Sequence, residues 1–252
     1  MNTVKTILAA LAIIASAATA EAQQSDKPKK LVIVEGHFFD EIPVANDNIT
    51  ALYMLATPSG TRATGVEMSE PLPEAALQFA LPAEEVAEAD ALLRLFDETK
   101  AAGKGIAVSF AKAEKLIAEG SRFPAFSATD IDGRVWSNAD VEGKVMVLNL
   151  WFTGCGPCRA EMPELSQWRT EMDDVMFFSS TWEDAATARP VLESCGFNWT
   201  ALVGDRQFKE WIGSAGYPLT IVVDKQGTVA KVEYGTSPLQ RAELKQTILS
   251  LR

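Results

Sequence analysis

An apolar run that ends in two closely spaced cysteines constrains this chain more than any other feature. Residues 145–152 are almost entirely apolar, and Cys155 and Cys158 follow in a short turn that leads into a polar, helix-like segment. This pattern predicts a buried strand and then a helix that begins at the cysteines. Unpaired amides at a helix N-terminus stabilise a thiolate, so we predict that Cys155 is an accessible nucleophile. Cys158 is close enough to attack a mixed disulfide at Cys155 and release the product.

The same two cysteines also fit a structural disulfide or half of a zinc site. One further cysteine, Cys195, and a single histidine, His37, complete the cysteines and histidines of the chain. A tetrahedral zinc site would need all three cysteines and His37. A copper carrier of the Sco type needs a histidine after its cysteines, and the sequence has none there. We therefore predict no metal and no cofactor.

The first residues have the pattern of an export signal. Lys5 supplies a positive charge, residues 7–18 are small or apolar, and residues 18–22 offer small-residue cleavage sites. The apolar run is too short to span a bilayer comfortably. We expect residues 1–22 to be a signal peptide cleaved near residue 20–22, which leaves a periplasmic protein without stable membrane insertion. An uncleaved anchor is the alternative.

Composition narrows the class of protein and its partners. The 252 residues are 47% hydrophobic and 23% charged, which is typical of a globular chain with one large domain or two ordinary ones. The formal net charge of −11 argues against nucleic acid or an anionic membrane surface as the main partner.

The order of predicted elements changes near residue 120. Residues 23–120 predict a small β-rich module with helices, and no motif in them indicates a chemistry. The expected elements of this module are strands at 31–39, 49–56, 61–68 and 75–81 and helices at 83–100 and 111–119. Residues 121–252 instead alternate strands with helices and end in a hairpin and a closing helix. This order predicts an α/β domain with a mixed sheet covered on both sides.

Separated stretches of this second region resemble the TlpA/ResA-like branch of the thioredoxin superfamily. They are Cys155–Leu165, with the sequence CGPCRAEMPEL, the stretch Gly216–Asp224, with the sequence GYPLTIVVD, and the upstream stretches Phe123–Phe126, Asp130–Arg134 and Gly143–Val145. The resemblance covers residues 121–252 and implies a thioredoxin-like mixed sheet flanked by helices. It also implies that Cys155 is the nucleophile and Cys158 the resolving thiol.

Glu161 is the candidate for handling protons at the cysteines. It follows Cys158 by one helical turn, so its carboxylate can approach the dithiol. A glutamate at this motif position in ResA-like proteins assists proton movement. A carboxylate held there would have a raised pKa and could accept the proton of Cys158 as that thiol attacks. A solvated glutamate favoured by the helix dipole is the alternative.

The resemblance also implies a substrate-binding surface around the cysteines. Pro218 matches the family's cis-proline, beside which the substrate polypeptide binds as an added strand, and Tyr217 would contact that substrate. An ordinary trans turn proline is the alternative. Gly156 and Pro157 form the dipeptide of reducing thioredoxins, which implies reduction rather than oxidation. Gly154 departs from the family, which often has tryptophan there, so we expect a wider approach to Cys155 or an altered substrate choice.

These assignments predict a periplasmic thiol–disulfide oxidoreductase that reduces disulfides of exported proteins at Cys155 and Cys158. The resemblance implies apocytochrome c as a candidate substrate and a membrane electron donor that restores the reduced enzyme. One alternative is a thiol peroxidase, although Thr153 lies two residues before Cys155 and peroxiredoxins place their threonine three residues before the attacking cysteine. The other alternative is a partner-binding protein that uses the thioredoxin fold as a scaffold.

Overall fold

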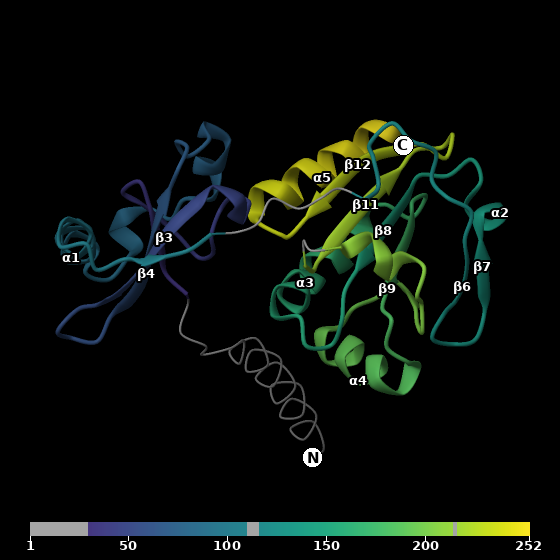
Figure 1. Cartoon of the computed structure of the whole chain (residues 1–252), viewed down its shortest axis with the longest axis horizontal. Coiled ribbons are helices and arrows are strands. Elements are labelled where there is room, and N and C mark those ends of the chain that lie inside the picture. The colour runs from purple at the N-terminus through teal and green to yellow at the C-terminus, as the bar shows by residue number, and fades with distance from the viewer. Residues whose placement is uncertain (1–29, 110–115, 214–215) are drawn as a thin grey trace, which may run out of the picture. The chain divides into compact units, whose positions relative to one another are not determined.

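The computed structural model describes residues 30–109, 116–213 and 216–252. Two five-stranded sheets form the framework of these residues (Figure 1). The predicted signal peptide, residues 1–22, lies outside the described residues, as do residues 111–115 of the expected helix 111–119. Among the described residues, no helix combines the length and the apolar character needed to cross a membrane.

The first sheet has the strand order β2-β1-β4-β3-β5. Its strands are β1 Val32–Val34, β2 His37–Phe39, β3 Ile49–Ala56, β4 Arg62–Met68 and β5 Ile106–Ala107. The accompanying helices are the 3-10 helices η1 Asn46–Asn48, η2 Glu74–Phe79 and η3 Ala83–Glu85 and the α-helix α1 Ala89–Ala101. Leu92 and Phe96 of α1 are buried against the apolar side chains of this sheet, which include Tyr53.

Three sequence predictions for this region differ from the structure. The expected strand 31–39 is split into β1 and β2 because Glu35 and Gly36 adopt positive φ angles of 47° and 81°, which close a tight turn. The expected strand 75–81 is wrong, since that segment forms η2, which begins directly after Pro73. Prolines on both sides of it cannot donate to a strand ladder, and they favour turns. The expected helix 83–100 begins only at Ala89, after the short η3.

The second sheet has the strand order β10-β9-β8-β11-β12. Its strands are β8 Met146–Leu150, β9 Met176–Ser180, β10 Thr200–Leu202, β11 Leu219–Val223 and β12 Val229–Tyr234. Strands β8, β9 and β10 are parallel, whereas β11 runs antiparallel to both β8 and β12. The helices are α2 Asn138–Val141, α3 Gly156–Glu171, α4 Ala185–Cys195, the 3-10 helix η4 Phe208–Ile212 and α5 Pro238–Leu251. A small hairpin of β6 Ser127–Thr129 and β7 Val135–Ser137 precedes them.

Strand β8 is buried on both faces, as its continuous apolar run predicts. Val147 packs in a cluster with Met162 of α3 and Ile248 of α5. Its neighbour Leu148 points to the opposite face and packs in a second cluster, with Phe208 of η4. The predicted α/β fold with a mixed sheet buried on both faces is confirmed.

The sheet places the segments around the two cysteines at one edge. Residues 151–155 follow the end of β8, and residues 217–218 precede the start of β11. Because β11 is antiparallel to β8, the pairing of Leu219 with Leu150 puts the start of one strand beside the end of the other.

Candidate active site

The two cysteines form a disulfide at the N-terminus of α3. Cys155 is the N-cap residue of this helix, and its Sγ accepts a hydrogen bond of 3.2 Å from the backbone N–H of Cys158. Gly156 and Pro157 are the first two residues of the helix, and both are exposed. The same N–H that reaches the sulfur in the disulfide can stabilise a thiolate on Cys155 in the reduced protein. The predicted accessibility of Cys155 is not seen in this disulfide state, since Cys155 and Cys158 are 5% and 1% exposed and pack in an apolar cluster. Their position at a helix N-terminus still fits reversible dithiol chemistry.

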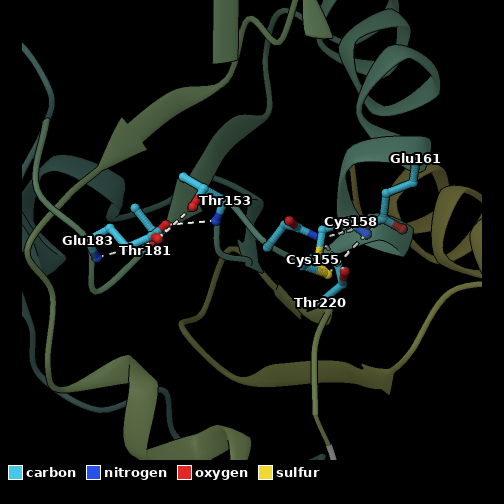
Figure 2. Close-up of a disulfide and its surroundings, with 8 residues drawn as sticks. Thr153, Cys155, Cys158, Glu161, Thr181, Glu183 and Thr220 are labelled. Carbon is cyan, nitrogen blue, oxygen red and sulfur yellow. Dashed lines mark hydrogen bonds between the residues drawn. A yellow bond between two sulfur atoms is a disulfide. The ribbon is translucent and has the colours of Figure 1, made fainter. Parts of the chain in front are cut away.

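Glu161 is buried on α3 one turn after Cys158, with 4% of its surface exposed. Asn149 of β8 donates its side-chain amide to Oε1 of Glu161 at 2.9 Å and to Oγ1 of Thr220 at 3.0 Å. All three side chains are buried, and Figure 2 shows Glu161 and Thr220 close to the disulfide. The structure therefore does not support the alternative of a solvated glutamate.

Burial raises the pKa of Glu161 from 4.5 to about 7 because the charged carboxylate loses its hydration. Hydrogen bonds from Thr236 and Asn149 and the positive charge of Arg241 oppose this rise, and the negative charge of Glu164 adds to it. Arg241 of α5 is itself held in place, since it donates to Glu164 at 2.6 Å and to Thr236 at 3.0 Å. A carboxyl group with a pKa near neutrality is suited to both accepting and donating a proton.

Pro218 lies at the same edge of the sheet as the dithiol, and the Tyr217–Pro218 peptide bond is cis, as the resemblance predicts. Pro218 is buried and directly precedes β11, and Thr220 two residues later lies opposite Asn149. Tyr217 is half-buried and packs against the apolar cluster that contains both cysteines. The structure thus brings together the predicted site residues Cys155, Cys158, Glu161, Gly156, Pro157, Tyr217 and Pro218.

Sequence reasoning missed an acidic side chain that holds the segment leading to Cys155. Glu183, between β9 and α4, accepts hydrogen bonds from the backbone N–H and the hydroxyl of Thr153, both at 2.7 Å. Thr181 contributes a further hydroxyl at 3.3 Å. Figure 2 shows these three residues on one side of the disulfide and Glu161 on the other. No sequence motif marks Glu183, but its position just beyond the strand that pairs with β8 is a usable signal.

Sequence reasoning also missed Phe152, whose aromatic ring lies over Gly154. A Cβ atom built on Gly154 would stand 2.8 Å from Cε2 of Phe152, which is too close for any larger residue unless the ring moves. The Phe152 ring makes an edge contact with Tyr217, with 5.1 Å between ring centroids. The glycine at position 154, where the family often has tryptophan, therefore leaves room for the Phe152 ring that contacts Tyr217.

The remaining cysteine and the histidine lie elsewhere. Cys195 ends α4 as a half-buried free thiol, and His37 is an exposed residue of β2 in the first sheet. Within the described ranges, no group of three or more histidine, cysteine or acidic side chains is arranged to hold a metal ion.

The second sheet, its helices and the dithiol at the start of α3 define a thioredoxin-like redox protein. The solution structure of a protein assigned as a disulfide isomerase from Bacteroides thetaiotaomicron superposes with a TM-score of 0.51 at 21% identity, over 54% of this chain and 91% of that one. The signature of the Redoxin family matches residues 118–248, just over half of the 252 residues, and the chain belongs to this family.

Relatives in sequence confirm the resemblance to ResA-like proteins. Thioredoxin-like protein YneN of Bacillus subtilis (strain 168) is 28% identical over 142 residues, which are 54% of this chain and 84% of that protein. Thiol-disulfide oxidoreductase ResA of Geobacillus thermodenitrificans (strain NG80-2) is 28% identical over 158 residues, which are 60% of this chain and 88% of that protein. Together with the cysteine pair, they place the chain among enzymes of the thiol–disulfide oxidoreductase class.

Proposed function

We propose that this protein is a periplasmic thiol–disulfide oxidoreductase that reduces disulfides of exported proteins. The observation that carries the proposal is the dithiol at the N-terminus of α3 with a buried carboxyl group one turn below it and a cis-proline at the same edge of the sheet. The proposed chain organisation is a signal peptide at 1–22, an N-terminal module at 23–120 and the thioredoxin-like domain at 121–252.

The first chemical step joins enzyme and substrate. The Cys155 thiolate attacks one sulfur of the substrate disulfide, a mixed disulfide forms at Cys155, and the other substrate sulfur leaves as a thiolate that takes a proton from solvent. The N-terminus of α3 stabilises the attacking thiolate. Tyr217 and Pro218, together with the exposed Gly156 and Pro157, position the substrate strand beside Cys155.

The second step releases the reduced substrate. Cys158 gives its proton to the Glu161 carboxylate and attacks the Cys155 sulfur, so the enzyme disulfide forms and the second substrate thiolate leaves and takes a proton from solvent. Glu161 then returns its proton to solvent. The substrate gains two electrons and two protons over the two steps, and the enzyme ends in the disulfide state that the structure describes. A membrane-held dithiol donor then returns two electrons and two protons to Cys155 and Cys158.

The Gly156-Pro157 dipeptide supports the proposed direction, and the N-terminal export pattern supports the proposed substrate class. That dipeptide is shared with reducing thioredoxins, whose potential is about −270 mV against about −120 mV for the oxidant DsbA. Relatives named ResA, and a thiol:disulfide interchange protein named HelX from Rhodobacter capsulatus, support exchange with protein disulfides. Apocytochrome c is the candidate substrate.

The test is substrate trapping in the periplasm of a host that exports the full chain. The Cys158→Ser variant cannot resolve the mixed disulfide, so we expect a stable adduct at Cys155 that reductant releases and mass spectrometry identifies. The matched control carries Cys155→Ser as well and should capture nothing. Peroxide turnover by the wild-type protein with no captured adduct would favour the thiol peroxidase alternative. Full cellular function of Cys155→Ser would favour the scaffold alternative.

A further inference from the structure

A side chain at position 154 would collide with a neighbouring aromatic ring. Gly154 is exposed and lies outside the glycines with left-handed backbone, so its φ angle does not require glycine. The ring is that of Phe152, whose Cε2 and Cδ2 atoms would stand 2.8 Å and 3.4 Å from a Cβ at position 154. Phe152 thus occupies space immediately beside the residue that precedes the nucleophile.

Phe152 also joins the two segments on either side of the dithiol. It belongs to the segment after β8, and its ring contacts Tyr217 of the segment before β11 with an interplanar angle of 64°. Both rings pack against the cluster that contains Cys155 and Cys158, yet both are only half-buried. Part of this aromatic pair therefore faces solvent beside the cluster that contains both cysteines.

The backbone beside Phe152 is held in place. Thr153 turns its hydroxyl and its N–H to the Glu183 carboxylate, which fixes the residue between Phe152 and Gly154. Two hydrogen bonds to Glu183 thus hold the segment that carries Phe152.

We propose that Phe152 and Tyr217 form an apolar wall that receives an aliphatic side chain next to the reactive cysteine of the substrate polypeptide. The inference rests on the proposed disulfide exchange and adds Phe152 as a specificity-determining residue. An aliphatic side chain loses contact with water against the two half-exposed rings. An acidic side chain there would instead lose hydration against the same rings.

The probes are disulfide-linked homodimers of one short peptide that carries Leu, Gly or Glu next to its cysteine. The reduced full-length protein is mixed with each, and its rate of oxidation is measured. We expect the Leu peptide to react about tenfold faster than the Gly peptide, and the Glu peptide to react most slowly. In Phe152→Ala the Leu-to-Gly ratio should fall to within about twofold.

Two further variants keep the test decisive. Gly154→Ala changes an exposed position and pushes the Phe152 ring aside, so it should also lower the Leu-to-Gly ratio, even where Phe152→Ala fails to fold. Trp182→Ala removes an exposed aromatic residue outside the wall and should keep the wild-type ratio. Equal rates of the wild-type protein on the three peptides, or a Leu-to-Gly ratio lost only in Trp182→Ala, would contradict the proposed apolar wall. Neither result would contradict the proposed disulfide exchange. Failure of wild type to react with any peptide would remove both proposals.

Discussion

Asn149 donates its side-chain amide to Glu161 at 2.9 Å, which ties the central strand β8 to α3 one turn after Cys158. The same amide group reaches Thr220 of β11 at 3.0 Å, so one buried side chain connects the strand before the cysteines, the helix after them and the strand after Pro218. A buried amide that donates to two acceptors fixes the position of both. The carboxyl group of Glu161 is thus held in one orientation rather than left to rotate.

Removing a hydrogen bond to Glu161 should raise its pKa above about 7. Thr236→Val is close in shape and deletes the hydroxyl that stabilises the charged carboxylate and that also accepts from Arg241, so both effects raise the pKa. We expect a rise of about one unit, the worth of one hydrogen bond to a charged group. Carbon-detected NMR titration of the oxidised protein measures it. Thr247→Val, on the exposed face of α5, is the control and should leave the Glu161 titration unchanged.

The raised pKa of Glu161 predicts how stability depends on pH. Between pH 4.5 and about 7 the unfolded chain loses the Glu161 proton while the folded protein keeps it, so stability falls over this range and the loss is complete above it. Glu161→Gln removes this loss and should stabilise the oxidised protein by about 3 kcal/mol at pH 8. At pH 4 the two proteins should unfold alike in urea. Glu193→Gln, at an exposed position of α4, is the control and should change the free energy of unfolding by less than about 0.5 kcal/mol.

The fold and the cluster of candidate residues were largely predictable because their signals are local in sequence. Cys155, Cys158 and Glu161 lie within one short stretch, and the alternation of strands and helices after residue 120 identifies the sheet. The prediction of a strand at 75–81 failed because the apolar residues there have the pattern of a strand, whereas the flanking prolines favour the 3-10 helix that forms. The local sequence pattern was sufficient to predict a site residue wherever that residue and its neighbours lie on one helix or strand.

Residues whose function depends on strand pairing were not predictable. Asn149 sits inside an apolar run, and its contact with Thr220 exists only because β8 and β11 pair at that register. Glu183 meets Thr153 because β9 runs parallel to β8, so the segments after both strands emerge side by side. The sequence distance of 30 residues between them hides this contact. Phe152 was hidden for a different reason, since an aromatic residue at the end of an apolar strand looks like ordinary core.

The role proposed for Glu161 predicts a specific change in kinetics. Single-turnover reduction of a disulfide peptide separates the attack by Cys155 from the later attack by Cys158. In Glu161→Gln the second step should slow about 100-fold, the effect of losing a general base, and should no longer rise with pH near 7. The first step should stay near the wild-type rate. A second step with wild-type rate and pH profile in Glu161→Gln would contradict the proton-accepting role.

The contacts of Glu183 predict that this residue supports both stability and substrate positioning. Glu183→Ala leaves the N–H and the hydroxyl of Thr153 without their acceptor, so we expect a loss of about 2 kcal/mol in the free energy of unfolding. The KM for disulfide peptides should rise because the segment before Cys155 is less well fixed.

A graded series separates this specific role of Glu183 from a general effect of charge. Glu183→Gln keeps one oxygen acceptor and replaces the other with an amide donor, so it should restore only one of the two bonds to Thr153 and about half of the lost stability. Glu193→Ala removes an exposed carboxylate near the end of α4 and should change unfolding by less than about 0.5 kcal/mol. Urea unfolding of the oxidised proteins measures all three. Equal stability of Glu183→Ala and Glu193→Ala would mean that Glu183 does not hold the segment that positions Cys155.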